Sequence, residues 1–377
     1  MNNAPELAMS GESSKMDQGE SPVYEAVLIT PEYIFDPEAE HTAPIRIFEG
    51  FLSQGDLVVW IGREKHRKTN FILQCAICVA LGRDFLNFRF AASNPLRVIV
   101  IDYESKAASL KKRYAAICGG MTLGPEDKAQ LKQNLRIIDV RRSYETGNEI
   151  PRFPANNKSD EDKKAEKFWQ ELRKDNPADL YIIDPMRSMH GEDENDSKIE
   201  RLLVRLRRLF GGAALIIAHH MTKAGAGQWE LRLKTDMRAW SDGARGSGAI
   251  KAHADVIVCQ ERSIEDEREV VSWGAFLRDD ADIEPISVVE SDPQSFYWEA
   301  SLDVPDHLRA SYEALRKEGA RFRTQNDAAQ VLRRATGKSK ATAYRHLIQM
   351  RNIGLVTANT NGEWLLRALK AAQPAEQ

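Results

Sequence analysis

Five short, almost continuous apolar runs, separated by stretches with helical periodicity, constrain the fold of this chain more than any other feature. The runs are residues 57–62 (LVVWIG), 97–102 (RVIVID), 135–140 (LRIIDV), 179–184 (DLYIID) and 213–220 (AALIIAHH). Runs of this length and composition are typical of strands that are covered on both faces. Because such an alternation produces parallel sheets, the sequence predicts an α/β fold in which helices flank a twisted, mostly parallel sheet.

The segments between and after these runs agree with this fold class. In the clearest helical segment, residues 197–212, six apolar side chains share one face: Ile199, Leu202, Leu203, Leu206, Leu209 and Phe210. Three further helices are expected at 68–82, 105–120 and 164–176. Residues 268–280 and 286–300 alternate over shorter spacings, which predicts antiparallel strands added to the edge of the sheet.

The pattern changes near residue 303, where three helical segments and two short strands follow one another. The helices are expected at 305–319, 324–337 and 339–354, with Thr324 and Ser339 as N-caps, and the strands at 355–358 and 363–368. The strands flank the turn 359–362 (NTNG), as in a hairpin. Three helices and a hairpin form the layout of a winged helix-turn-helix.

These patterns divide the chain into four parts: a disordered tail (1–25), the α/β domain (26–300), the winged-helix domain (303–370) and a second tail (371–377). The first tail is polar and acidic and lacks the apolar segment of an export signal. No apolar stretch reaches the roughly 18 to 20 residues of a membrane span. The four cysteines, without a secretory signal, predict a cytoplasmic protein. Cys75 and Cys78 have C-x-x-C spacing inside an apolar run, which favours buried thiols over redox or metal chemistry.

Residues 62–70 (GREKHRKTN) lie between a predicted strand and a predicted helix and contain the Lys-Thr pair of a phosphate-binding loop. In such a loop, backbone N–H groups enclose the phosphates, a lysine reaches their oxygens and a hydroxyl holds Mg²⁺. The residues expected to bind nucleotide are Gly62, Arg63, Glu64, Lys65, His66, Arg67, Lys68, Thr69 and Asn70.

Arg67 stands where such a loop has its last glycine, which permits close approach of the backbone because it lacks a Cβ. Two outcomes are open. Arg67 adopts the required backbone angles and its side chain points outward, or it narrows the loop and weakens binding. A solvated basic turn between strand and helix is the third interpretation of this segment.

Side chains at the ends of three other predicted strands fit a nucleotide site. Asp184 ends the strand 179–184, from which a carboxylate can hold Mg²⁺ or its water. Glu104 follows the strand 97–102 and is either a group that polarises a water molecule or the cap of the next helix. His219 and His220 end the strand 213–220, where histidine is also common as a structural residue.

Together, the order and spacing of these motifs resemble a RecA-like ATPase core, and most closely the RepA-type branch of hexameric replicative helicases. The resemblance extends from about Ile45 to Glu290. It is carried by GREKHRKT (62–69), VIVIDYES (98–105), LYIIDP (180–185), AHHMTK (218–223) and DGARGSGAIKAHADVIV (242–258).

The resemblance implies that ATP and Mg²⁺ are the ligands. Lys68 and Thr69 would contact phosphates and Mg²⁺, and Asp184 would be the acid on the Mg²⁺ side. Glu104 would be the catalytic carboxylate, and His220 would sense the γ-phosphate.

The resemblance also implies a homo-oligomeric ring, such as a hexamer, in which catalysis is completed between subunits. Arg278 would reach a neighbouring subunit's nucleotide, with Arg245 as the alternative for that role. Arg67 departs from the family pattern, which places hydrolysis in question more than the fold.

A local excess of positive charge predicts contact with DNA in the C-terminal part. Residues 321–351 carry eight basic side chains and one acidic one, a local charge of +7 in a chain whose formal net charge is −3. In the predicted recognition helix, the apolar side chains Ala343, Leu347, Ile348 and Met350 are expected in the core. The residues expected at duplex DNA are Arg333, Arg334, Lys338, Lys340, Thr342, Tyr344 and Arg345. A winged helix used for protein contacts is the alternative.

The long segment 222–248 is a second candidate for DNA contact, because loops of this length inside compact domains are usually functional or disordered. In a RecA-like ring, such loops line the central channel and hold single-stranded DNA by charge and stacking. The basic residues concerned are Lys223, Arg232, Lys234, Arg238 and Arg245. A mobile loop with another purpose is the alternative.

The sequence therefore predicts a DNA-binding RecA-like ATPase: an oligomeric helicase or translocase, or another replication-type ATPase. The first alternative is a DNA-binding regulator that senses nucleotide without hydrolysing it. A circadian-clock-like or kinase relative that acts on other substrates is the third interpretation, and it leaves the C-terminal basic cluster unexplained.

Overall fold

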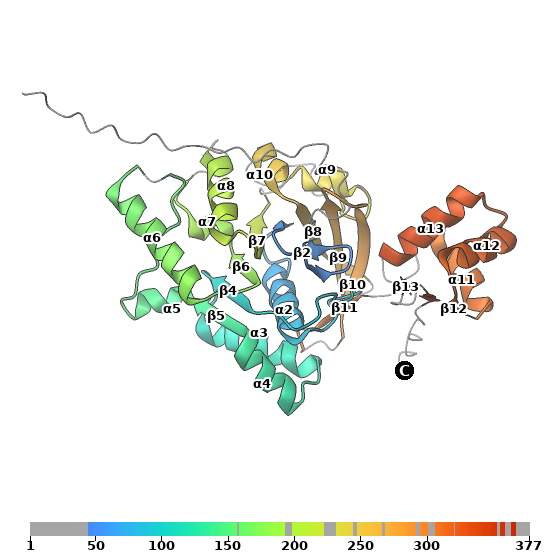
Figure 1. Cartoon of the computed structure of the whole chain (residues 1–377), viewed down its shortest axis with the longest axis horizontal. Coiled ribbons are helices and arrows are strands. Elements are labelled where there is room, and N and C mark those ends of the chain that lie inside the picture. Colours follow the sequence, from blue (N-terminus) through green and yellow to red (C-terminus); the bar gives the residue numbers. More distant parts are fainter. Residues whose placement is uncertain are drawn as a thin grey trace, which may run out of the picture. The chain divides into compact units, whose positions relative to one another are not determined.

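The computed structural model divides the chain into two units, Met1–Ala43 and Pro44–Gln377. The structure describes residues 44–156, 158–192, 198–221, 231–243, 247–265, 268–291, 295–300, 306–319, 321–352, 355–358 and 363–366, all of which belong to the second unit (Figure 1). The boundaries expected at residues 25 and 370 lie outside this part of the chain, and the boundary near residue 303 stays a prediction.

A nine-stranded sheet in the order β11-β10-β9-β8-β3-β7-β6-β4-β5 forms the centre of the α/β part. Its strands are β3 (Leu57–Gly62), β4 (Val98–Asp102), β5 (Leu135–Asp139), β6 (Leu180–Asp184), β7 (Ala214–His220), β8 (Val256–Glu265), β9 (Arg268–Leu277), β10 (Ile283–Glu290) and β11 (Trp298–Ala300). The six strands from β8 to β5 pair in parallel, and β9, β10 and β11 add antiparallel pairs. The predicted α/β class with a mostly parallel sheet is therefore confirmed, as is the antiparallel extension.

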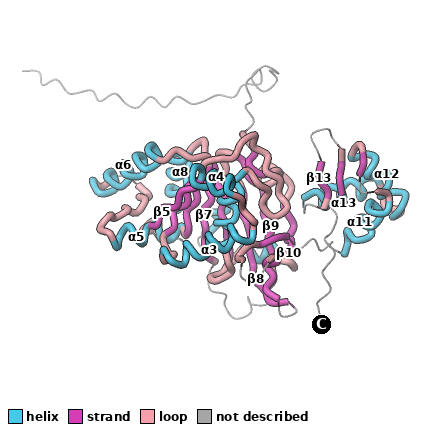
Figure 2. The backbone as a smooth tube through the Cα atoms, turned by 90° about the horizontal axis from the view of Figure 1, so that it is seen from below, coloured by secondary structure: helices cyan, strands magenta, loops and turns pink. Residues whose placement is uncertain are grey.

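Helices cover the sheet on both faces (Figure 2). Alternate residues of each central strand point to opposite sides of the sheet, so each face has its own hydrophobic cluster against these helices. The helices are α2 (Lys68–Leu81), α3 (Ala107–Gly120), α4 (Pro125–Asn134), α5 (Val140–Glu145), α6 (Asp160–Asp175), α7 (Met186–Met189), α8 (Lys198–Phe210), α9 (Met237–Ser241) and α10 (Ser247–His253). One hydrophobic cluster contains Val58 and Trp60 of β3 together with the apolar residues of α2. The other contains Val59 and Ile61 together with α8.

Helix α2 is buried along almost its whole circumference, which explains the apolar run around its two cysteines. Cys75 and Cys78 are fully buried and free, and burial raises the pKa of the Cys78 thiol to about 12. Both thiols are therefore protonated core side chains, as predicted. Among the described residues, no group of three or more metal-ligating side chains comes together.

The short hairpin of β1 (Arg46–Phe48) and β2 (Leu52–Ser53) begins the described chain. Phe48 and Phe51 of this hairpin pack in an aromatic cluster with Phe85 and Trp273, the last of which belongs to β9. The segment before the phosphate loop is thus fixed to the antiparallel part of the sheet.

The C-terminal part consists of α11 (Asp306–Lys317), β12 (Arg321–Phe322), α12 (Gln325–Thr336), α13 (Lys340–Asn352), β13 (Val356–Ala358) and β14 (Trp364–Leu366). Its strands form an antiparallel sheet in the order β12-β14-β13, in which the two-residue β12 is an addition to the predicted hairpin. Thr324 and Ser339 accept hydrogen bonds from the N–H groups of Asp327 and Thr342, as expected of N-caps. The turn 359–362 lies outside the described residues.

The core of the C-terminal part corrects one assignment. Ala343, Leu347 and Met350 of α13 are fully buried, as predicted, but Ile348 is 44% exposed. Leu347 already fills the inward position on that turn of the helix, so the side chain at 348 is turned away from the core.

Within the described residues, no helix has the length and apolar character needed to cross a membrane.

The attachment of the edge strand β11 gives a first testable prediction. Gln74 of α2 is buried, accepts a hydrogen bond from the Trp298 N–H (2.9 Å) and donates one to the Trp298 carbonyl (2.8 Å). Gln74→Leu leaves both backbone groups buried without these partners. We expect the free energy of unfolding, measured by urea denaturation, to fall by about 2–4 kcal/mol. The control Gln133→Leu, at an exposed position of α4, is expected to change it by less than about 0.5 kcal/mol. Equal effects of the two substitutions would contradict this account of β11.

Candidate functional site

The segment between β3 and α2 has the backbone of a phosphate loop, including the left-handed residue at its last position. Arg67 is the N-cap of α2 and has φ 66° and ψ 14°. Lys65 is also left-handed, with φ 64°. An L-residue in this conformation is strained by roughly 1–2 kcal/mol relative to the right-handed region, a strain that glycine does not have. Arg67 therefore takes the backbone angles expected of glycine, which is the first of the two outcomes foreseen for it.

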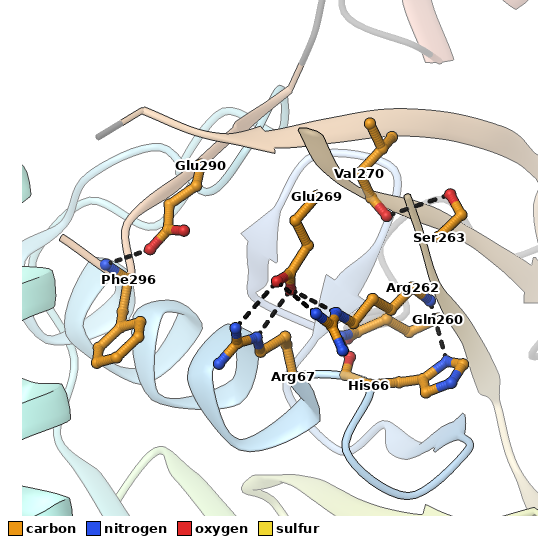
Figure 3. Close-up of polar contacts among 9 residues, drawn as sticks. All are labelled: His66, Arg67, Gln260, Arg262, Ser263, Glu269, Val270, Glu290 and Phe296. Carbon is orange, nitrogen blue, oxygen red and sulfur yellow. Dashed lines mark hydrogen bonds and ion pairs between the residues drawn. The ribbon is translucent and has the colours of Figure 1, made fainter. Parts of the chain in front are cut away.

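The side chain of Arg67 points to the β8–β9 hairpin (Figure 3). Its guanidinium donates two hydrogen bonds to the two oxygens of Glu269, at 2.8 and 2.9 Å. Arg262 of β8 pairs with the same carboxylate at 2.9 Å. Although burial opposes it, hydrogen bonding from the two arginines holds the pKa of Glu269 below its usual range. The alternative of a freely solvated basic turn does not describe this residue.

His66 ties the loop to β8 through both its ring and its backbone. Its Nδ1 accepts a hydrogen bond from the Arg262 N–H at 3.0 Å, and its carbonyl accepts one from the Gln260 side chain at 2.5 Å. Burial, together with the nearby positive charges of Arg63 and Lys68, lowers the pKa of His66 to about 4. The ring is therefore neutral at pH 7, as an acceptor must be. Gln260 is itself fixed by Trp60, whose indole donates to it at 2.7 Å.

Gly62 begins the loop at a point of close backbone approach. A Cβ at this position would lie 2.8 Å from the carbonyl oxygen of Gln260. Any larger residue would displace either the start of the loop or β8. From the sequence, Gly62 is expected only to be one of the residues that bind nucleotide, and this close approach explains why the position needs glycine.

Lys68 lies at the start of α2 with 6% of its surface exposed. Its ammonium donates to the carbonyls of Gly62 (2.7 Å) and Arg63 (2.9 Å) and lies 3.3 Å from Nδ1 of His220. Burial lowers the pKa of Lys68 to about 8, although the carboxylates of Asp184 and Glu104 oppose the shift. A buried cation whose hydrogen-bond partners among the described residues are carbonyls and an imidazole is suited to accept an anion.

Two aspartates meet at the same edge of the sheet, because β4 and β6 are paired in register with Asp102 opposite Asp184. Burial raises the pKa of Asp184 to about 6, while a hydrogen bond from the Thr69 side chain opposes the rise. Thr69 and Asp184, the predicted Mg²⁺ pair, are thus in contact. Oxygen ligands of these two kinds suit a hard cation such as Mg²⁺.

Glu104 lies close to Asp184, and the alternative interpretation of Glu104 as the cap of the next helix is wrong. Partial burial and the neighbouring charge of Asp102 raise the pKa of Glu104, while Lys68 opposes the rise. The N-cap of α3 is Lys106, so Glu104 does not cap that helix. The turn is formed instead by Asp102, which accepts hydrogen bonds from the N–H groups of Glu104 (3.0 Å) and Ser105 (2.7 Å). Sequence reasoning missed Asp102, although its place at a strand end was the available signal.

Arg278 lies at the end of the parallel strands opposite the loop, and its contacts are with residues of its own chain. It follows β9, whose last residues pair with the first residues of β8, whereas Gly62 ends β3. Its guanidinium donates to the carbonyls of Ala252 and Ala254 and pairs with Asp255 at 3.3 Å. The structure does not bring Arg278 to the loop of its own chain, and its role toward another subunit stays a prediction.

The residues expected to bind single-stranded DNA are only partly described, since Lys223 and Arg245 lie outside the described residues. Arg232 lies 3.8 Å from Glu261, and Lys234 lies 3.0 Å from Glu265. Arg238 lies over the ring of Phe276, 5.9 Å from its centre. Two of the three described basic side chains are therefore paired with carboxylates of β8.

Four basic residues of the C-terminal part line a hollow of about 680 Å³ between α12 and α13. Its lining includes Arg333, Arg334, Lys338, Lys340 and Tyr344. Lys340 lies over the Tyr344 ring at 5.9 Å, and the hydroxyl of Thr342 is 3.0 Å from that of Ser339. Arg345 is exposed on the same helix. Four of the eight basic residues predicted for this segment therefore line one surface depression, whereas Arg345 lines a second one.

Comparisons with known proteins found a family model that matches the α/β part. The family model described as an AAA domain (AAA_25) matches residues 34–226, which is just over half of the chain. No curated protein matches the sequence. A solved KaiC-like protein from the hyperthermophilic archaeon Pyrococcus horikoshii OT3 is similar, with 15% identity and a TM-score of 0.43 over 67% of this chain and 93% of that chain. The family match contains the loop, Glu104, Asp184 and His220, but not Glu269.

The raised pKa of Asp184 gives a second prediction. Because this pKa is about 6 in the folded chain and ordinarily 3.8, the folded chain holds the proton more tightly, and stability falls as pH rises from about 4 to about 6. Asp184→Asn removes the buried charge. We expect the variant without ligands to unfold with a free energy larger by on the order of 1–3 kcal/mol at pH 7.5. This gain should disappear near pH 4.

Urea denaturation at the two pH values measures the effect, with Asp279→Asn in an exposed turn as the control. That control is expected to shift stability by less than about 0.5 kcal/mol at either pH. A gain for Asp184→Asn that is the same at pH 4 and pH 7.5 would show that burial of the charge is not its cause.

Proposed function

We propose, from the premise that the chain belongs to the AAA domain family, that it is a RecA-like ATPase that binds ATP and Mg²⁺ at the loop between β3 and α2. The observation that carries the proposal is the left-handed backbone of Arg67, with its side chain paired to Glu269. The loop thus keeps its glycine-like shape although residue 67 has a long side chain.

The residues around the loop fit both ligands. Lys68 exchanges its carbonyl partners for phosphate oxygens, which are stronger acceptors for an ammonium group. Asp184 and the Thr69 hydroxyl would hold Mg²⁺, and the positive charge next to Asp184 would favour its ionised form. When bound, Mg²⁺ neutralises charge that develops on the phosphates.

Hydrolysis requires a group that orients water at the terminal phosphate. Glu104 takes this role, because its raised pKa makes its carboxylate a stronger base toward a water molecule. Asp102 fixes the backbone of Glu104 through its hydrogen bond. His220 lies within 3.3 Å of the Lys68 ammonium, so it responds to the phosphate that Lys68 binds.

DNA is the partner that the charge distribution favours. The C-terminal part would act as a winged helix that binds duplex DNA, and the basic residues around the hollow would contact the DNA phosphates. Single-stranded DNA would bind basic residues of segment 222–248 in the channel of a ring. Arg232 and Lys234 would then exchange Glu261 and Glu265 for phosphates.

As such an ATPase, the chain acts as a helicase, a translocase or another replication-type ATPase, and it works as a homo-oligomer such as a hexamer. Arg278 or Arg245 would complete the site of a neighbouring subunit. The second candidate is a DNA-binding regulator that binds ATP without hydrolysing it. The attachment of His66 and Arg67 to the β8–β9 hairpin favours it, because a tethered loop resists rearrangement during a reaction.

The first test uses Lys68→Ala. Loss of the buried ammonium should weaken ATP binding at least about tenfold and abolish turnover stimulated by single-stranded DNA. Lys112→Ala, at an exposed position of α3, is the matched control and should leave both unchanged. Glu104→Gln separates the two candidates: it abolishes turnover but not binding in an ATPase, and changes neither in a regulator that has no turnover. ATP binding that survives Lys68→Ala would count against this loop as the site.

The second test concerns duplex DNA. Arg333 and Arg334 are exposed and line the hollow, so their joint replacement by alanine should weaken duplex binding. It should also reduce the slope of log affinity against log salt by about 1–2, since each lost phosphate contact removes about 0.9. The control replaces Arg316 and Lys317 of α11, which carry the same charge away from the hollow. Equal slopes for the two double variants would contradict the assignment.

A further inference from the structure

We infer that Glu269 is a positioning residue for the phosphate loop: by holding the Arg67 guanidinium, it maintains the backbone shape that glycine gives at this position. The inference rests on the proposed function, because the loop shape is taken to be the one that binds ATP. It assigns a role to a carboxylate that lies outside the residues matched by the family model.

The contact has the geometry of a strong pair. Nε and one terminal nitrogen of Arg67 each meet a different oxygen of Glu269, at 2.8 and 2.9 Å. A two-point contact of this kind fixes direction as well as distance, because the guanidinium and the carboxylate are both planar. Glu269 is more buried than a surface partner would be, with 16% of its side chain exposed. Arg67 cannot turn back into the loop without breaking both bonds.

Neighbouring groups hold the pair in place from several sides. Arg262 shares the Glu269 carboxylate, and the ring of Phe296 lies 5.8 Å from the Arg67 guanidinium carbon (Figure 3). The same hairpin holds the preceding residue, because Arg262 and Gln260 bind the ring nitrogen and carbonyl of His66. Two consecutive loop residues are therefore fixed by one hairpin, through contacts about 200 residues apart in sequence.

The pair is needed because Arg67 is not glycine. The left-handed strain of an L-residue corresponds to a bias of roughly 5- to 30-fold against this conformation. A charge-assisted two-point contact is of a size that offsets such a bias. A glycine at 67 would need no partner to adopt the same angles. Glu269 should therefore matter for ATP binding only while residue 67 has a side chain.

A double-mutant cycle tests this dependence. Dissociation constants for a fluorescent ATP analogue with Mg²⁺ are measured for the unaltered full chain, Glu269→Ala, Arg67→Gly and the variant with both changes. We expect Glu269→Ala to weaken binding roughly 5- to 30-fold in the unaltered chain, and by less than about twofold when glycine occupies position 67. Arg67→Gly alone should bind within about threefold of the unaltered chain, since the loop already has the required shape.

Further variants distinguish positioning from general effects on charge or folding. Glu265→Ala removes a carboxylate from the same hairpin, where it pairs with Lys234 rather than the loop, and should leave binding unchanged. Glu269→Gln retains an acceptor for one hydrogen bond and should weaken binding less than Glu269→Ala. If turnover is measurable, Glu269→Ala should raise KM and leave kcat nearly unchanged, because the loop shape affects binding of the ground state and transition state alike. Melting temperatures of all variants report on folding, and Glu269→Gln keeps the test valid if Glu269→Ala does not fold.

Each outcome decides a different claim. Equal weakening by Glu269→Ala in both backgrounds, or no weakening in the unaltered chain, overturns the positioning role and leaves the ATPase proposal intact. Failure of the folded, unaltered chain to bind the ATP analogue overturns the proposed function, and this inference with it.

Discussion

Parallel pairing in register of the central strands is the constraint on which the rest of the structure depends. It brings the carboxyl ends of neighbouring strands to one edge, so that Gly62 lies beside His220 and Asp102 lies beside Asp184. Residues scattered over more than 150 positions therefore meet without any long loop reaching across the molecule. The phosphate loop then needs only the short turn from β3 into α2 to place Lys68 and Thr69 at the same edge.

Much of this edge could be predicted from the sequence, because its signals are local. Apolar runs of six to eight residues marked five of the six parallel strands to within about one residue at each end, and the Lys-Thr pair marked the loop. Strand ends are polar for a physical reason: they leave the covered part of the sheet. Asp184, Glu104 and His220 were found in this way. Asp102 was missed although it ends a predicted strand, because its hydrogen bonds to the following turn are not visible in the sequence.

The parts that could not be predicted depend on contacts between distant segments. The chain shows an arginine in place of glycine at 67, but not that Glu269 receives its side chain, because that pairing depends on the register of β9 against β8. The contacts of Arg278 with Asp255 and with the carbonyls of Ala252 and Ala254 could not be predicted either, because they depend on the pairing of β9 with β8. In α13, helical periodicity left positions 347 and 348 equally able to face inward, and packing selected Leu347.

Burial also destabilises the charged forms of two side chains in the site, and ligands of the proposed kind would relieve this electrostatic strain. Burial pushes the pKa of Lys68 down and that of Asp184 up, so each would be more stable beside a charge of opposite sign than in the chain alone. The two groups only partly offset each other. In the proposed function, triphosphate would bring negative charge to Lys68 and Mg²⁺ would bring positive charge to Asp184, so binding of either ligand would favour binding of the other. Arg67 does not share this strain, because its guanidinium is paired with Glu269 at the β8–β9 hairpin. The charge left to attract phosphate in the buried part of the loop is therefore that of Lys68, and the hairpin controls the loop's shape rather than its charge.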